Sequence, residues 1–194
     1  LGCEKTRQAL VIDPGDELYK ILPLIEKHRL SVKYILSTHA HIDHVGDLET
    51  LKDQTGAEVL LHEKDLKLYQ NLPMQAAWLG VSSPATTKID HFIHEGDYVS
   101  FGRHSGEVLF TPGHTPGSLC LHLPEDSGKL FAGDTLFQMS IGRTDLWGGS
   151  SKNILTSIRN RLLVLQENTI VYPGHGPPTT IGNEKHHNPF LRGT

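Results

Sequence analysis

The segment "STHAHIDHVG", residues 37–46, places His39, His41, Asp43 and His44 close together in the chain. A buried imidazole needs hydrogen-bond partners or gives up its charge, so such crowding does not suit an ordinary core. Coordination of a divalent ion gives these side chains a common role. The segment therefore predicts a metal site whose remaining ligands come from elsewhere in the chain.

The spacing inside this segment suggests how its donors are divided. Alternate residues of an extended loop point to the same side, so His39 and His41 are expected to face one ion together. Asp43 and His44 open the next predicted helix and are expected to face a neighbouring position. Asp43 also has a simpler explanation, because an aspartate at a helix start often caps the helix.

Three further candidates follow predicted strands in glycine-containing loops. They are His114 in "FTPGHTPGS", Asp134 in "FAGDTLF" and His175 in "VYPGHGP". Glycine beside each of them lets the backbone turn and come close to a bound ion. The complete set offers nitrogen and oxygen but no thiolate, which suits Zn²⁺, Fe or Mn²⁺. Because the donors are too numerous for one catalytic zinc, we predict two divalent ions, zinc first among the three metals, with Asp134 shared between them.

The composition describes a chain with one sizeable core. The 194 residues are 37% hydrophobic and 21% charged and carry a net charge of −4, so we expect a single domain over residues 1–194 and no nucleic-acid partner. No apolar run approaches the roughly 20 residues of a membrane span, so no membrane association is expected. Cys3 and Cys120 form no C-x-x-C pair, which speaks against a disulfide framework and favours a cytoplasmic location.

The apolar periodicity predicts an α/β fold. Strands are expected at 8–15, 32–38 and 57–62, at 129–137 and before His175, and helices at 16–30, from about Asp43 onward, and at 151–166. The residues between 91 and 123 alternate apolar with polar side chains between glycine-rich turns, which is typical of antiparallel strands. Because the candidate ligands follow strands, we expect them to meet at one edge of a sheet.

The order H-x-H-x-D-H, G-H-T-P-G, G-D and G-H-G resembles the metallo-β-lactamase superfamily, and within it the glyoxalase II group, over nearly the whole chain. The resemblance implies an αββα sandwich of two mixed sheets with helices on the outer faces. It implies a first ion held by His39, His41 and His114. It implies a second ion held by Asp43, His44 and His175, with Asp134 between the two.

The two ends of the chain depart from the larger members of that group. Few residues precede the "VIDPG" strand, so we expect the extreme N-terminal strands to be missing from this sequence. Only 19 residues follow His175, so we expect no C-terminal glutathione-binding helical domain. The segments "SIGRTDLWGGS" (140–150) and "NPFLR" (188–192) resemble shorter, single-domain bacterial members.

The resemblance implies a binuclear hydrolase of thioesters such as S-lactoylglutathione, acting as a monomer or homodimer on a small-molecule substrate. Water between two divalent ions has its pKa lowered toward neutrality, which supplies a hydroxide nucleophile. Asp43 and Asp134 are the expected catalytic carboxylates. Arg143, Asp145 and Tyr172 are candidate substrate contacts, although an ion pair in a loop explains the first two equally well and a core aromatic explains the third.

Three alternatives stay open within the same family. Persulfide dioxygenases share the chain's size and its "GRTD" segment but use one iron held by two histidines and one aspartate. A ribonuclease Z-like nuclease shares the metal ligands, yet it normally carries an RNA-gripping arm and a basic surface, which this sequence does not suggest. Lactonase and β-lactamase activities form the third alternative.

Overall fold

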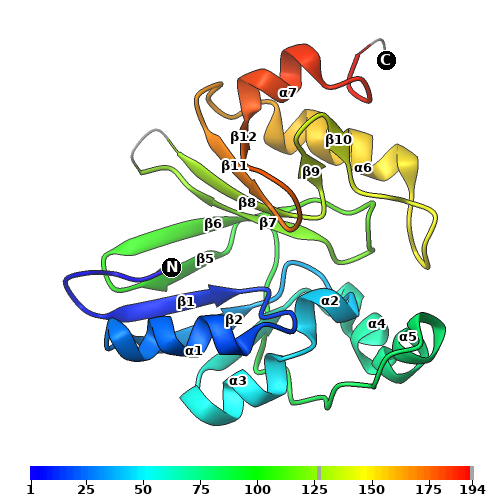
Figure 1. Cartoon of the computed structure of the whole chain (residues 1–194). Helices are drawn as coiled ribbons and strands as arrows, with labels where there is room; N and C mark the ends of the chain where they lie inside the picture. The colour runs from blue at the N-terminus through cyan, green and yellow to red at the C-terminus, as the bar shows by residue number, and fades with distance from the viewer. Residues whose placement is uncertain (126–127, 193–194) are drawn as a thin grey trace. The chain divides into compact units, whose positions relative to one another are not determined.

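The computed structural model describes residues 1–125 and 128–192, and the chain divides into two compact units (Figure 1). Unit 1 comprises Leu1–Ile93 and Ser100–Ser105. Unit 2 comprises His94–Val99 and Gly106–Thr194. The single domain expected over residues 1–194 stays a prediction.

Unit 1 is built on a four-stranded sheet in the order β1-β2-β3-β4. The strands are β1 (Gln8–Ile12), β2 (Ser31–Leu36), β3 (Glu58–Leu61) and β4 (His91–Phe92). The three neighbouring pairs of named strands run parallel, and an isolated antiparallel bridge joins Gly2 to Ala9 of β1. Parallel neighbours need long crossovers, and the connecting segments of unit 1 are helical.

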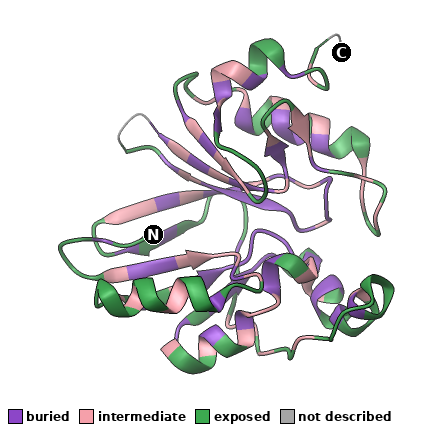
Figure 2. Cartoon of the chain, in the orientation of Figure 1, coloured by how far each residue is buried: buried purple, intermediate pink, exposed green. Residues whose placement is uncertain are grey.

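The helices of unit 1 pack on one face of its sheet. They are α1 (Leu18–Lys27), α2 (Ile42–Val45), α3 (Leu48–Thr55), the 3₁₀ turn η1 (Glu63–Asp65), α4 (Leu66–Gln70) and α5 (Leu72–Leu79). Leu18, Leu51 and Leu72 from three of these helices share a buried cluster with Ile35 and Val59 of the sheet. The β-α-β-α-β order predicted from the sequence is therefore confirmed. In Figure 2 many residues of the strands are buried, and most residues on the outer sides of the helices are exposed.

The helical segment η1–α4–α5 was not predicted. Its helices are short, and Pro73 stands in the first turn of α5, so no long apolar period marks them. They form because Leu68, Tyr69 and Leu72 are buried in the cluster of unit 1. Gly80 ends α5 with a φ of 71°, in the left-handed region that glycine enters without strain.

Unit 2 is built on a six-stranded sheet in the order β12-β11-β8-β7-β6-β5, some residues of β5 and β6 being assigned to unit 1. The strands are β5 (Tyr98–Phe101), β6 (His104–Phe110), β7 (Leu119–Leu123), β8 (Lys129–Gly133), β11 (Ile170–Pro173) and β12 (Thr179–Thr180). Strands β6, β7 and β8 pair antiparallel, as predicted for the middle of the chain, whereas β8 and β11 are parallel. This sheet is therefore mixed, and a two-stranded sheet of β9 (Leu136–Phe137) and β10 (Ser140–Ile141) accompanies it.

Three helical segments pack on the sheet of unit 2. They are α6 (Ser151–Ser157), the π-helical segment η2 (Ile158–Leu162) and α7 (Ile181–His187). Ile154, Ile158 and Leu162 share a buried cluster with Leu130 and Val171 of the strands. The helix predicted over 151–166 is confirmed, although it ends earlier and changes to π geometry. Helix α7 is not among the helices predicted from the sequence.

Two sequence expectations about environment can be compared with the structure. Cys3 and Cys120 are both buried free thiols, in agreement with the absence of a disulfide framework. Within residues 1–125 and 128–192, none of the helices has the length and apolar character that crossing a bilayer requires.

Candidate metal centre

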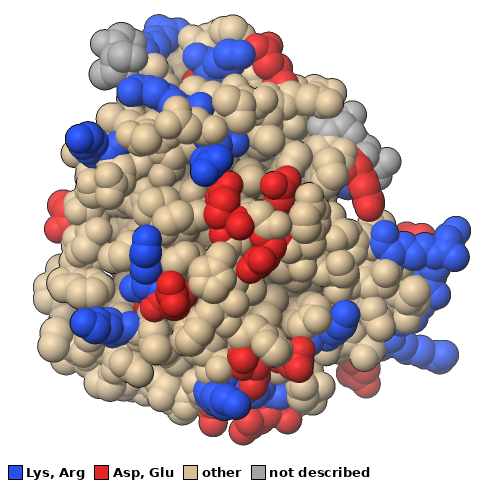
Figure 3. Space-filling model, turned by 180° about the vertical axis from the view of Figure 1, so that it is seen from behind, with Lys and Arg blue, Asp and Glu red and all other residues tan. Residues whose placement is uncertain are grey.

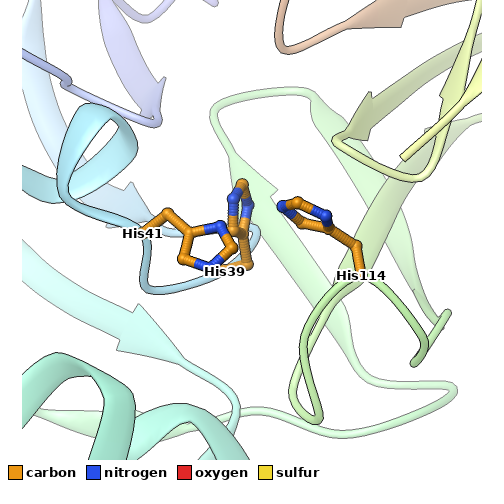
Figure 4. A group of neighbouring side chains, drawn as sticks. All are labelled: His39, His41 and His114. Atoms are coloured by element: carbon orange, nitrogen blue, oxygen red, sulfur yellow. The ribbon is translucent and has the colours of Figure 1, made fainter. Parts of the chain in front are cut away.

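Unit 1 brings the four donors of the 37–46 segment together. His39 and His41 lie in the loop that follows β2, and Asp43 and His44 lie in α2 (Figure 4 draws His39 and His41). The ring centroids of His39 and His44 are 4.0 Å apart, and those of His39 and His41 are 4.9 Å apart. The Nε2 atom of His44 lies 3.7 Å from Oδ2 of Asp43. The proximity predicted for these four side chains is present.

Asp13 orients His44 from the end of β1. Oδ2 of Asp13 lies 3.0 Å from Nδ1 of His44 and accepts from the Thr38 hydroxyl at 2.6 Å, while Oδ1 accepts from the Thr38 amide at 2.7 Å. A carboxylate accepts hydrogen bonds, so the imidazole carries its proton on Nδ1 and keeps the Nε2 lone pair for a metal. Sequence reasoning did not select Asp13. The available signal was an acid at the end of an apolar strand, in "VIDPG".

The ligand atoms of Asp13, His39 and His44 all lie within 4.8 Å of one another. Because the Asp13 carboxylate is already engaged by Thr38 and His44, we assign it to orientation rather than coordination. The turn after Asp13 reaches the same loop. A Cβ on Gly15 would lie 2.2 Å from the carbonyl oxygen of Asp43, so only glycine allows this approach.

Unit 2 brings its three donors together from three different strand ends. His114 follows β6, Asp134 follows β8 directly, and His175 follows β11. Oδ2 of Asp134 lies 3.6 Å from Nε2 of His114 and 3.8 Å from Nε2 of His175. One carboxylate oxygen thus faces two imidazoles, which is the arrangement that a shared ligand requires. The His114 and Asp134 side chains are largely buried, whereas that of His175 is more than half exposed.

A backbone carbonyl orients His114. Nδ1 of His114 donates to the carbonyl oxygen of Arg143 at 2.8 Å, which leaves Nε2 as the nitrogen that faces Asp134. The neighbouring Gly142 permits this path of the chain, because a Cβ there would lie 1.9 Å from the Asp134 carbonyl oxygen. Arg143 therefore contributes to the site through its main chain.

The Arg143 side chain has a different partner. It donates two hydrogen bonds to the carboxylate of Asp145, at 2.8 and 2.7 Å, and both side chains are exposed. These hydrogen bonds lower the pKa of Asp145 to about 2. The loop ion pair expected as the alternative explanation is present. Substrate contact by Arg143 or Asp145 stays a prediction.

Two further features surround the donors of unit 2. The buried hydroxyls of Thr111 and Thr135 lie 3.0 Å apart and link the chain after β6 to the chain after β8. The Tyr172 ring stacks on Phe131 of the neighbouring strand, with centroids 5.2 Å apart and an interplanar angle of 14°. This stacking explains the position of Tyr172 without a ligand, so its proposed contact with substrate also stays a prediction.

The donor chemistry fits divalent ions. The candidate ligands are imidazoles and carboxylates, and in both His44 and His114 an acceptor holds Nδ1 so that Nε2 is the nitrogen that would coordinate a metal. Ligands of this kind suit zinc, iron and manganese. The residues present are therefore able to hold the metals that the sequence predicts.

Comparison with known proteins gives a consistent result. A sequence profile of the metallo-β-lactamase superfamily matches residues 4–175. The probable metallo-hydrolase YqgX of Bacillus subtilis is 40% identical over 187 residues, which are 96% of this chain and 88% of that protein. The hydroxyacylglutathione hydrolase GloC of Haemophilus influenzae is also 40% identical over 187 residues, covering 95% of this chain and 88% of that protein.

Solved structures agree with these relatives. The B3 metallo-β-lactamase BLEG-1 is 39% identical with a TM-score of 0.91, covering 100% of this chain and 92% of that one. TTHA1623, solved in a di-iron-bound form, is 42% identical with a TM-score of 0.85, covering 93% and 88%. ETHE1 from Myxococcus xanthus is 30% identical with a TM-score of 0.79, covering 97% and 76%. The predicted fold class is confirmed, and the chain belongs to the metallo-β-lactamase superfamily.

Proposed function

We propose that this protein is a binuclear metal-dependent hydrolase of small-molecule thioesters, with an acylglutathione such as S-lactoylglutathione as the substrate class. The observation that carries the proposal is the position of Asp134, whose Oδ2 faces both His114 and His175. A carboxylate shared between two imidazoles is suited to bridging two ions. The hydroxyacylglutathione hydrolase GloC, at 40% identity, supports the thioester class.

The proposed ligands follow the division made from the sequence. The first ion takes His39, His41 and His114, the second takes Asp43, His44 and His175, and Asp134 serves both. Asp13 and the Arg143 carbonyl hold two of these imidazoles by Nδ1 and so present Nε2. Iron deserves a test beside zinc, because the 42% identical TTHA1623 was solved in a di-iron-bound form.

The chemistry is hydrolysis of an acyl–sulfur bond. Two divalent ions, when bound, supply a hydroxide near neutral pH and stabilise negative charge on the carbonyl oxygen. The Asp43 side chain is 55% exposed and its Oδ2 lies 3.7 Å from His44 Nε2, so this carboxylate would hold the second ion and orient the attacking hydroxide beside it. The leaving thiol has a pKa of about 8.5, so its thiolate departs without a proton from the protein.

The charge on one face of the molecule, drawn in Figure 3, is compatible with a small substrate. On the face drawn in Figure 3, lysine and arginine side chains are interspersed with aspartate and glutamate, and no continuous basic strip crosses the described residues of that face. A nucleic-acid ligand would need such a strip. A cytoplasmic location and a monomeric or homodimeric state belong to the same proposal.

The decisive experiment measures metals and activities on one natively purified sample. We expect two metal ions per chain and hydrolysis of S-lactoylglutathione well above that of a lactone or a cephalosporin. Glutathione persulfide is assayed in parallel with an oxygen electrode. One iron per chain together with oxygen consumption on the persulfide would overturn the hydrolase proposal in favour of a dioxygenase, and cephalosporin cleavage as the dominant activity would reassign the substrate.

A further inference from the structure

The loop that carries the candidate ligands of unit 1, residues 37–46, makes three backbone hydrogen bonds with side chains outside it. The Ala40 amide donates to Oδ2 of Asp65 at 3.0 Å. The Ile42 amide donates to Oε1 of Gln75, and Nε2 of Gln75 donates to the Ala40 carbonyl, both at 3.0 Å. The residues that alternate with the candidate ligands are therefore held through their backbone by η1 and α5.

These hydrogen bonds supply backbone partners and stability that the loop and the short helix α2 do not provide by themselves. Helix α2 spans only Ile42–Val45, which is too short to be stable without outside contacts. Its first amide groups lack helical acceptors, and they are commonly satisfied by the N-cap side chain. Here the N-cap residue is His41, whose side chain makes no capping hydrogen bond and is a proposed metal ligand. Oε1 of Gln75 accepts a hydrogen bond from the first of these amides, that of Ile42.

Gln75 is well suited to this task because its amide both donates and accepts. Its Oε1 accepts from Ile42, while Nε2 donates to the carbonyls of Ala40 and Leu68, the second also at 3.0 Å. The Leu68 contact ties Gln75 to α4, and Leu68 and Tyr69 of α4 are buried in the core of unit 1. A rigid support thus reaches the backbone on both sides of His41.

We propose that Gln75 is a positioning residue that, together with Asp65, fixes the backbone of residues 40–42 so that His39, His41 and Asp43 are preorganised for metal. This inference rests on the proposed function for its metal, but the clamp itself is a property of the protein chain. It assigns a role in the metal site to the segment η1–α4–α5.

Amide hydrogen exchange on the full-length, metal-stripped protein tests the clamp without any activity. In Gln75→Met, which keeps the side-chain length but no hydrogen bond, we expect the Ile42 amide to exchange at least about tenfold faster, because it loses its acceptor. The Ile35 amide in β2 should be unaffected. Gln70→Met is the matched control, since Gln70 is exposed at the end of α4. Unchanged exchange at Ile42 would overturn the clamp.

Metal affinity tests the positioning role. Chelator competition with Zn²⁺ should show affinity about 10-fold weaker in Gln75→Met, the lower end of what loss of an outer-shell partner costs. Gln75→Glu should bind Zn²⁺ no more tightly than Gln75→Met. It keeps the acceptor for the Ile42 amide, but it points a carboxylate oxygen at the carbonyl oxygens of Ala40 and Leu68. Faster exchange with unchanged affinity would overturn positioning.

The unfolding midpoint of the metal-free proteins completes the comparison. Loss of three hydrogen bonds should lower the midpoint of Gln75→Met below that of Gln70→Met in either case, so affinity is compared at a temperature where both metal-free proteins are fully folded. Positioning predicts weaker Zn²⁺ binding there, and equal binding would assign Gln75 a purely structural role. A wild-type protein that binds no Zn²⁺ would refute the proposed function, while the exchange comparison would still decide whether the clamp exists.

Discussion

The two donor sets of this protein are built in different ways. In unit 1 four candidate ligands come from one short segment, and side chains hold them: Asp13 orients His44, and Gln75 supports the backbone beside His41. In unit 2 three candidate ligands come from three strand ends, and His114 is oriented by a backbone carbonyl. This difference implies that a single substitution outside the candidate ligands should disturb the positions of the unit 1 ligands far more easily than those of the unit 2 ligands.

The largest effect is expected at Asp134. Its carboxylate faces both imidazoles of unit 2, so Asp134→Ala removes the group proposed to serve two ions. We expect loss of both metals and a fall in thioester hydrolysis of at least about 1,000-fold, since the nucleophile depends on the ions. Metal analysis by mass spectrometry and initial rates check this, and two tightly held ions in the variant would refute the bridging role.

A smaller loss is expected at His175, the most exposed of the three donors in unit 2. His175→Ala should empty mainly the second position, because the first is proposed to use other imidazoles. The metal content should fall from about two ions to about one per chain, because the second position loses one of its ligands. If hydrolysis continues undiminished with one ion bound, the reaction needs only the first position.

The third effect concerns orientation in unit 1. Asp13→Ala removes the acceptor of His44 Nδ1 and of the Thr38 amide and hydroxyl. We expect metal affinity 10- to 100-fold weaker, the usual cost of losing such a partner, with the second ion lost first. Asp16→Ala is the control, because Asp16 is exposed in the same turn. Equal affinities in the two variants would show that the loop orders itself without Asp13.

The same comparison explains how much of the site was predictable from the sequence. The spacing within one short segment is enough to identify four candidate ligands, His39, His41, Asp43 and His44. His114, Asp134 and His175 could be selected because each stands beside glycine after an apolar strand. The order of strands and helices from β1 to β3 followed equally from local periodicity, whereas η1–α4–α5 did not.

The supporting residues were missed because their roles depend on distant contacts. Asp13 reaches His44 across 31 positions, and Gln75 reaches Ala40 across 35. Glu184 is fully buried in α7 and accepts from the Met139 amide and from Asn188, yet nothing in "IGNEKHHNP" separates it from a surface acid. Periodicity describes which side of an element is apolar, but not which polar side chain reaches another segment.

The smallest effect is expected at Arg143, where side chain and backbone have separate roles. Arg143→Gln removes the hydrogen bonds that hold the pKa of Asp145 at about 2, so this pKa should rise toward its ordinary value of about 3.9. The depressed pKa stabilises the fold above about pH 4, and this contribution is lost as the pH falls through about 2. The pair is exposed, so the stability change should be small.

Metal binding should be unchanged in the same variant, because the carbonyl that accepts from His114 is retained. A carbon-detected NMR titration of the Asp145 carboxyl measures the first effect, and chelator competition measures the second. Weaker metal binding in Arg143→Gln at pH 7 would mean that the side chain, through Asp145, also sets the position of the carbonyl. The unit 2 donors would then depend on a side-chain contact as the unit 1 donors do, and the contrast between the two sets would fail.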